Sequence, residues 1–320
     1  MNTRWPASPR PLVEDMVRRV KIHTVLLDLG GPIRDSRVAL NDAHNAAVEK
    51  LLGRKLAEHE KFRPDETWKL MGLRGLTKED AVIPLIWAIK KKELREKVKV
   101  DLSSILESED PLAELKKIAK RYPYEKNKLE RHLRRWRETF NAAMNEEGLD
   151  KAPLAEGVEG ALRLLSDLGI RIAVATAAGE EAGRAYLQKR NVRQIRIIVG
   201  KERFRDRSKP HPYTLNAALH DLWFKQRFPT VSEAETKKIN IDDPNTFKHL
   251  RDLKRGTLYV GDAPTDVEAA KKAGVYAVSI TQGMGSERDL KNAGPKLMVR
   301  NLLELAQHLK KNKGYLVLED

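Results

Sequence analysis

The sequence predicts an α/β protein: a doubly wound, Rossmann-like parallel sheet into which an all-helical domain is inserted. Three observations lead to this fold class. From residue 150 onward, short apolar runs alternate with helical patterns. Residues 37–149 show apolar positions only at three- and four-residue spacing. One strand-like run at 22–29 precedes this helical block, so the sheet must draw on both sides of it.

The stretch IHTVLLDL, at residues 22–29, is the clearest strand. It is rich in apolar and β-branched residues, and it gives way to Gly30-Gly31-Pro32, a sequence typical of a turn. Asp28 stands at the end of this run. In parallel sheets with helices on both faces, ligands bind at the carboxyl ends of the strands. Asp28 is therefore a candidate functional residue.

The helical block begins near residue 37, where VALNDAHNAAVEKLLG predicts a helix that ends at Gly53. The pattern then stays helical to about residue 149. We expect the following division of the chain: an N-terminal extension at 1–21, an α/β core at 22–36 and 150–320, a helical cap domain at 37–149, and a polar surface insertion in the core at about 222–255.

Composition excludes several classes of protein. The 320 residues include no cysteine, so disulfides, thiol catalysis and cysteine-based zinc sites are excluded. No apolar run approaches the roughly 20 residues of a membrane span, and the N-terminus lacks the apolar core of a signal peptide. We therefore expect a cytoplasmic protein with no membrane partner.

The formal net charge of +15 favours anionic partners such as phosphorylated metabolites or nucleic acid. Basic residues are interleaved with acidic ones in stretches such as EKNKLERHLRRWRE, a pattern typical of a solvated helix with ion pairs between residues i and i+4. No motif of a nucleic-acid-binding fold is found. A small phosphorylated substrate is therefore the expected partner, and nucleic acid is not favoured.

Polar side chains follow several of the predicted strands. Asp28 ends the first, Thr176 ends IAVAT, and Asp262 follows LYVG, with Asp266 four residues further on. SKPHPY presents Lys209 before a predicted helix. The carboxyl ends of parallel strands share one edge, so these residues should converge there. Carboxylates suit Mg²⁺, and a lysine with a hydroxyl suits phosphoryl oxygens, so a phosphate-processing site is expected.

Four segments in this order resemble the motifs of the haloacid dehalogenase superfamily of hydrolases. LLDLGGPIRDS is similar to the first motif, AVATAAG to the second, SKPHPY to the third and YVGDAPTDVEAAKKAG to the fourth. The resemblance covers residues 22–36 and about 150–310. It implies the following site: Asp28 as catalytic nucleophile and Mg²⁺ ligand; Thr176, Ala177 and Lys209 on the phosphate; and Asp262 and Asp266 on the metal.

The helical block lies between the first and second motifs, where the phosphoglycolate phosphatase-like branch of this superfamily carries its helical cap. Within the block, KLMGLRGLTKED is similar to the specificity loop of that branch. The similarity makes Arg74 and Lys78 candidate substrate-binding residues. It implies a Mg²⁺-dependent phosphohydrolase with a small phosphorylated substrate.

Gly30 departs from the family pattern, in which a second aspartate follows the nucleophile by two residues. In the family that side chain protonates the leaving group and then activates water, while its backbone carbonyl binds Mg²⁺. Glycine keeps the carbonyl, so Gly30 remains a candidate Mg²⁺ ligand. The general acid–base help, worth about 10²–10⁴ in rate, is missing. Asp35 matches the family's trailing aspartate but lies too far along the loop to be an obvious substitute.

Three interpretations follow from Gly30. The favoured one is a phosphohydrolase whose substrate carries a good leaving group, such as an acyl phosphate or diphosphate, or whose cap supplies the acid.

The second is a non-phosphatase member of the family. Phosphonoacetaldehyde hydrolase-like enzymes lack the second aspartate, but their cap lysine falls on Gly75 here, and their third motif usually has arginine instead of lysine. Dehalogenases lack it too, but they need no metal pair. The third is a catalytically weak binding or regulatory protein.

Overall fold

The computed structural model describes residues 18–72, 79–143, 152–203, 207–230 and 248–318. A six-stranded parallel sheet forms its centre, in the order β4-β3-β2-β5-β6-β7. The strands are β2 (Thr24–Leu27), β3 (Arg171–Ala175), β4 (Ile197–Val199), β5 (Thr257–Gly261), β6 (Tyr276–Ile280) and β7 (Leu297–Val299). The predicted doubly wound α/β fold is confirmed.

The central strand β2 has the burial that the sequence predicts. All four of its residues are buried, with β3 on one side and β5 on the other. A parallel strand covered by helices on both faces reads as a continuous apolar run, because neither face meets water. Val25 pairs with Ile172 on one side and with Leu258 on the other, which fixes the register of the three middle strands.

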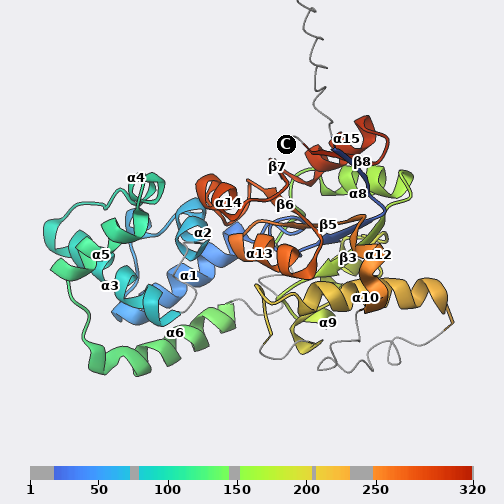
Figure 1. Cartoon of the computed structure of the whole chain (residues 1–320). Helices are drawn as coiled ribbons and strands as arrows, with labels where there is room; N and C mark the ends of the chain where they lie inside the picture. The colour runs from blue at the N-terminus through green and yellow to red at the C-terminus, as the bar shows by residue number, and fades with distance from the viewer. Residues whose placement is uncertain (1–17, 73–78, 144–151, 204–206, 231–247, 319–320) are drawn as a thin grey trace, which may run out of the picture.

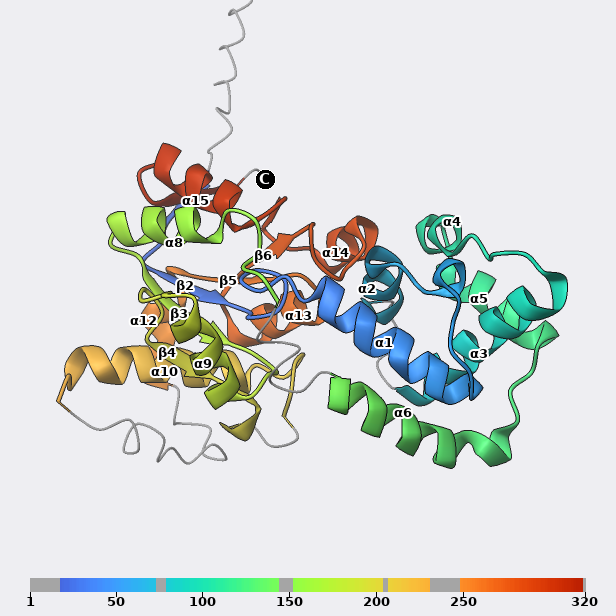
Figure 2. The same ribbon diagram turned by 180° about the vertical axis from the view of Figure 1, so that it is seen from behind.

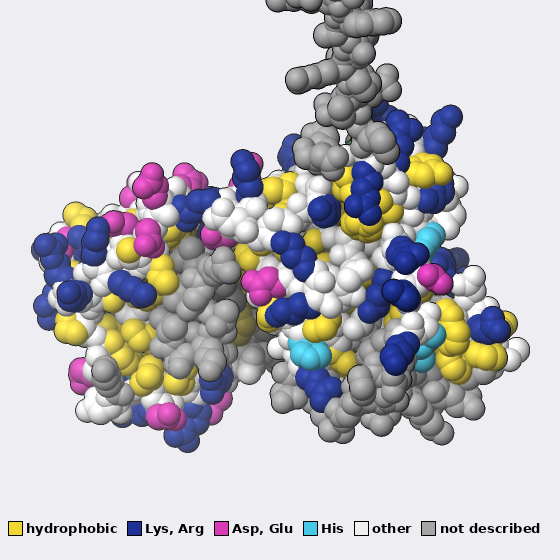
Figure 3. All heavy atoms as spheres, in the orientation of Figure 1, with side chains coloured by type: hydrophobic (Ala, Val, Ile, Leu, Met, Phe, Trp, Pro, Cys, Tyr) yellow, Lys and Arg dark blue, Asp and Glu magenta, His cyan; other side chains and the backbone are white. Residues whose placement is uncertain are grey.

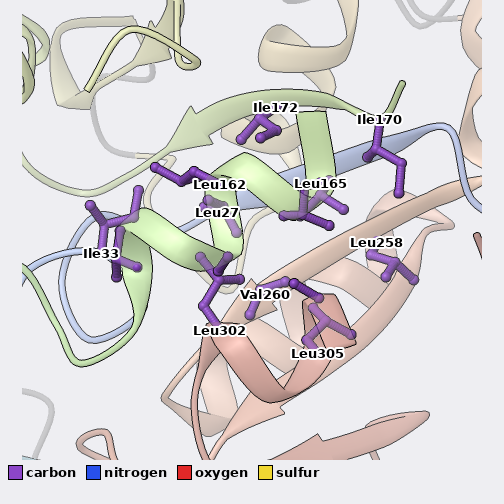
Figure 4. Close-up of a cluster of buried hydrophobic side chains, with 14 of the residues drawn as sticks. Leu27, Ile33, Leu162, Leu165, Ile170, Ile172, Leu258, Val260, Leu302 and Leu305 are labelled. Atoms are coloured by element: carbon purple, nitrogen blue, oxygen red, sulfur yellow. The ribbon is translucent and has the colours of Figure 1, made fainter. Parts of the chain in front are cut away.

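Helices cover both faces of the sheet (Figures 1 and 2). On one face, α8 (Val158–Asp167), α9 (Glu180–Lys189) and α15 (Leu302–Lys311) contribute to a cluster of buried apolar side chains. Figure 4 shows Leu162, Leu165, Leu302 and Leu305 of this cluster against the strands. On the other face lie α10 (Tyr213–Arg227) and α13 (Pro264–Ala273). The sheet is thus held rigidly between two apolar layers.

The helical module has an apolar core of its own. Its helices are α1 (Arg37–Leu52), α2 (Pro64–Gly72), α3 (Glu79–Glu96), α4 (Leu102–Glu107), α5 (Pro111–Arg121) and α6 (Leu129–Ala143), with short 3₁₀ turns at Glu58–Glu60 and Lys126–Lys128. The helix predicted to end at Gly53 does so, and Gly53 takes a left-handed conformation with φ of 70°.

The module lies beside the edge of the sheet where β2 ends (Figures 1 and 2). A short helix of the core, α14 (Glu287–Ala293), reaches it. Arg288 of α14 donates hydrogen bonds to the backbone carbonyls of Ser108, at 2.9 Å, and Glu109 in the α4–α5 connection. The module therefore stands next to the strand ends that carry the candidate site.

Two segments differ from the sequence prediction. Arg18–Lys21, expected to belong to an N-terminal extension, forms strand β1, which pairs antiparallel with β8 (Tyr315–Leu318). The polar insertion expected from residue 222 begins later, because α10 continues through Arg227 and buries Leu222. The last residues of the expected insertion are also structured: they form a 3₁₀ turn at Lys248–Leu250 and helix α12 (Arg251–Lys254).

A further 3₁₀ turn spans Lys201–Arg203. None of the described helices is long and apolar enough to cross a membrane.

Candidate active site

Three neighbouring strands deliver polar side chains to one point. Asp28 directly follows β2, Thr176 follows β3 and Asp262 follows β5. Since β3, β2 and β5 are adjacent and parallel, their carboxyl ends meet at one edge. Carboxylate oxygens of Asp28, Asp262 and Asp266 all lie within 4.8 Å of one another. The convergence expected from the sequence is therefore present in the structure.

Lys209 lies at the centre of this group. Its Nζ is 2.7 Å from Oδ2 of Asp28 and 2.6 Å from Oδ1 of Asp266. The lysine sits in the loop between β4 and α10, and its side chain is only 10% exposed. Burial alone lowers the pKa of Lys209, but the charges of Asp266 and Asp28 outweigh it, so the pKa is raised well above the usual value. Lys209 is thus a fixed positive charge.

Asp266 anchors the site through the start of helix α13. Its Oδ2 accepts hydrogen bonds from the backbone N–H groups of Asp262, at 3.1 Å, and Ala263, at 3.0 Å. These bonds pair two backbone N–H groups at the start of α13, where N–H groups have no partner within the helix. Pro264, the first residue of the helix, has no N–H that needs a partner. Because both oxygens of Asp266 are engaged, its carboxylate holds Lys209 and the Asp262 backbone in place.

Asp262 is enclosed by two glycine-containing loops. A Cβ on Gly31, which has φ of +80°, would lie 2.4 Å from Cγ of Asp262, and one on Gly283 would lie 2.0 Å from its Cβ. Met284 donates its backbone N–H to Oδ2 of Asp262 at 2.8 Å. Both loops approach the carboxylate so closely that only glycine fits. Burial, followed by the charges of Asp266 and Asp28, raises the pKa of Asp262 to about 8.

The Asp28 carboxylate is largely buried but held by donors. Its Oδ1 accepts the backbone N–H of Leu29 at 2.8 Å, and the Thr176 hydroxyl also hydrogen-bonds to it. Burial raises the pKa of Asp28, and the neighbouring Lys209 charge opposes this. Three carboxylates face one ammonium here, so the group carries excess negative charge when ionised. Oxygen donors with excess negative charge fit a divalent cation such as Mg²⁺.

The turn after β3 places Thr176 beside Asp28 and leaves Ala177 exposed. The Thr176 hydroxyl accepts the backbone N–H of Ala178 at 3.2 Å, which shapes this turn. A hydroxyl and an exposed backbone next to a lysine suit an anionic group.

At Gly30 the structure leaves open space. A Cβ built on Gly30 would meet no atom within 4 Å, and its φ is not in the left-handed region, unlike that of Gly31. Backbone geometry and packing therefore do not require glycine at this position. Position 30 could hold a side chain, so the lack of a carboxyl there removes an acid–base group without any structural need for glycine.

Sequence reasoning missed Tyr259, which lies in β5. Its hydroxyl is 3.1 Å from Nζ of Lys209 and 3.1 Å from Oδ1 of Asp266, and it donates to the carbonyl of Ala175 at 3.2 Å. In the sequence, a tyrosine inside a buried strand is interpreted as a core residue. The one indication of another role is that a buried tyrosine hydroxyl usually needs a hydrogen-bond partner. Two predicted site residues, Arg74 and Lys78, lie outside the described residues.

Comparison with family models agrees with this geometry. A model described as haloacid dehalogenase-like hydrolase matches residues 88–227, and one described as HAD-hydrolase-like matches residues 206–305. Their matches include the Lys209 loop and the Asp262 strand end. Residues 88–305 thus belong to haloacid dehalogenase-like hydrolase domains. Asp28, in the first motif of this HAD-like hydrolase, lies outside both matches.

Solved structures share the fold of this HAD-like hydrolase. A protein of Lactobacillus delbrueckii subsp. bulgaricus, provisionally named a phosphoglycolate phosphatase, matches with a TM-score of 0.56 and 16% identity over 90% of this chain and 98% of its own. A predicted phosphoglycolate phosphatase of Haemophilus somnus matches at 0.52 and 16%, over 89% and 97%. A predicted phosphatase of Clostridium acetobutylicum matches at 0.51 and 18%, over 91% and 99%. No curated protein matches the chain.

Proposed function

We propose that this HAD-like hydrolase is a Mg²⁺-dependent phosphohydrolase with Asp28 as its nucleophile. One observation carries the proposal: Asp28, Asp262, Asp266 and Lys209 meet at the carboxyl ends of β2 and β5. Asp28, the Gly30 carbonyl and Asp262 would hold Mg²⁺, with Asp266 in support. The cation would offset charge on the phosphate and on the carboxylates.

The chain's own residues would carry out the nucleophilic attack and bind the phosphoryl group. An Asp28 oxygen attacks phosphorus, so a carboxylate–phosphorus bond forms while the bond to the leaving oxygen breaks. Lys209 and Thr176, with the Ala177 backbone, bind the phosphoryl oxygens. Water then attacks the phosphorus of the aspartyl phosphate, which releases phosphate and restores the Asp28 carboxylate.

Gly30 indicates which class of substrate the site can cleave, because glycine lacks the acid that would protonate a leaving group. An acyl phosphate or a phosphoric anhydride expels a group that is stable without a proton, so it needs no such acid. We therefore propose a small acyl phosphate or diphosphate as substrate. The contacts of Arg74 and Lys78 with the substrate remain part of this proposal.

A panel of phosphates tests the function. The purified chain is given acetyl phosphate, p-nitrophenyl phosphate, sugar phosphates and phosphoglycolate, with Mg²⁺ or with EDTA, and phosphate release is measured. Hydrolysis of the activated phosphates only, dependent on Mg²⁺, supports the proposal. Failure to hydrolyse any of them, in a protein that binds Mg²⁺, favours a binding or regulatory role instead.

A further inference from the structure

The outer side of helix α6 carries an uncompensated positive charge. Helix α6 contains four arginines and two glutamates. Within α6, Arg131, Arg134 and Arg135 are exposed, while the residues that face the module core are buried: His132, Leu133 and Trp136. Arg134 and Arg135 lie three and four residues after Arg131, so each of them is a neighbour of Arg131 on the helix surface, at about 5–6 Å.

The ion pairs expected for this stretch do not neutralise that face. Lys128 pairs with Glu125, three residues before it instead of the expected four. Among the described residues, however, Arg131, Arg134 and Arg135 have no carboxylate within ion-pair distance. Glu138 stands on the same face one turn further on, and it forms no ion pair with them. The expectation of i,i+4 ion pairs is therefore wrong for Arg131, Arg134 and Arg135 among the described residues.

The position of α6 leaves this face free to meet a partner. In both ribbon views the helix forms one border of the helical module, with its outer side turned away from the other helices (Figures 1 and 2). Figure 3 shows lysine and arginine side chains gathered on the end of the module, and basic and acidic side chains side by side along the border where α6 lies. This surface lies on the cap, away from Asp28 and Lys209.

We propose that the arginine face of α6, formed by Arg131, Arg134 and Arg135, binds the phosphate backbone of double-stranded nucleic acid. Guanidinium groups match phosphate oxygens with two hydrogen bonds each and stay charged at any physiological pH. Three guanidinium groups on one side of α6 suit neighbouring phosphates of a backbone. Binding of this kind is independent of base sequence.

Two features favour a duplex over other polyanions. Among the described residues, the large exposed apolar ones are Val38, Leu94, Val98, Phe228 and Tyr315. None of them lies on α6, so the face has nothing to insert into a membrane. Single strands are usually held by exposed aromatic side chains that stack on bases. Trp136 is buried and Phe140 is half-buried beneath the face, so neither is presented for stacking.

The test measures binding of a fluorescein-labelled 20-base-pair DNA duplex by anisotropy at several salt concentrations. The full chain is compared with the variant R131Q/R134Q/R135Q and with a control, R163Q/R193Q/R196Q, which removes three exposed arginines from the α/β core. Both variants lose the same charge. Thermal unfolding followed by circular dichroism checks that each variant is folded.

We expect the wild type and the control to bind the duplex similarly. The α6 variant should bind at least about tenfold more weakly at low salt, and its slope of log K against log salt should be shallower by about 2–3, since each lost phosphate contact contributes about 0.9. Equal binding by the two variants overturns the proposal. So does the absence of duplex binding by the wild type, including the case in which it binds only phosphatidylserine-containing vesicles or a 20-nucleotide single strand.

Discussion

The ammonium of Lys209 lies between two carboxylates, 2.7 Å from Asp28 and 2.6 Å from Asp266. One carboxylate comes from the end of β2 and the other from helix α13, so this lysine joins the first and fourth motifs. Removing one partner of a buried ion pair leaves uncompensated charge and typically costs about 3–5 kcal/mol. Lys209 therefore has a structural role as well as a chemical one.

Lys209→Ala should lower the free energy of unfolding by about 3 kcal/mol or more and abolish phosphate release. Urea unfolding and the acetyl phosphate assay measure the two effects. The control is Lys69→Ala, which breaks the more exposed pair with Glu107 and should cost about 1 kcal/mol or less. Equal losses of stability in the two variants would show that the Lys209 ion pairs contribute no more than a surface pair.

Tyr259→Phe should slow hydrolysis because the hydroxyl helps to hold Lys209 and Asp266 in position. We expect a loss of about 1–3 kcal/mol in stability, typical of a hydrogen bond to a charged group, and about a tenfold fall in kcat. Tyr186→Phe is a matched control, because its buried hydroxyl bonds the carbonyls of Ala152 and Pro153 away from the site. If both variants keep full activity, Tyr259 does not position the site.

Gly30→Asp should restore the missing acid–base group. The open space around Gly30 accommodates a side chain, so the variant should fold normally. Without a base to activate water, the wild type should accumulate aspartyl phosphate and release a burst of p-nitrophenolate from p-nitrophenyl phosphate in rapid-mixing measurements. Gly30→Asp should remove the burst and raise the steady rate by about 10²–10⁴.

The neighbouring glycine gives the control for this substitution. Gly31→Ala places a Cβ against the Asp262 carboxylate in a left-handed backbone conformation, so it should destabilise the protein and reduce Mg²⁺ binding. Gly30→Ala should do neither. Equal melting temperatures and equal Mg²⁺ affinities in the two alanine variants would show that the Asp262 carboxylate does not require glycine at position 31.

The stability of the Mg²⁺-free protein should fall as the pH rises. The pKa of Asp262 is raised to about 8 from 3.8, so the folded state holds a proton that the unfolded state has lost. Its contribution to stability is complete below pH 3.8 and is lost as the pH rises to about 8, at up to about 1.4 kcal/mol per pH unit.

Melting temperatures in EDTA at pH 6 and pH 8.5 test this titration. The wild type should lose more stability between the two than Asp262→Asn, which has no proton to lose. Added Mg²⁺ should restore the wild type at pH 8.5, because it binds the ionised carboxylates. Parallel pH profiles for the two proteins would contradict the assignment of the raised pKa to Asp262.

The sequence was sufficient to predict the sheet and the residues at its edge. Central parallel strands are continuous apolar runs, and the polar residue after each of them is visible in the sequence as Asp28, Thr176 and Asp262. The pairing of β1 with β8 could not be predicted, because Arg18 and Leu318 come from opposite ends of the chain. Tyr259 was missed because a hydroxyl's partners depend on tertiary structure.

Patterns of charged residues in the sequence predicted the structure less well than patterns of apolar residues did. The stretch EKNKLERHLRRWRE suggested self-paired charges, yet Arg131, Arg134 and Arg135 form no ion pair with any residue that the structure describes. Side-chain geometry decides whether a nearby opposite charge is used, and an exposed pair contributes little energy to enforce that geometry. The expected start of the insertion at 222 was too early, because the buried Leu222 is followed by the polar residues Lys225, Gln226 and Arg227 at the end of α10.

The most direct test of the central claim compares Asp28→Asn with Asp35→Asn in Mg²⁺-dependent hydrolysis of acetyl phosphate. Asp35 lies in the same loop but forms an ion pair with Arg37. Loss of the nucleophile should reduce turnover by at least about 10³, whereas Asp35→Asn should stay within a few-fold of the wild type. Turnover by Asp28→Asn equal to that of the wild type would contradict the assignment of Asp28 as the nucleophile.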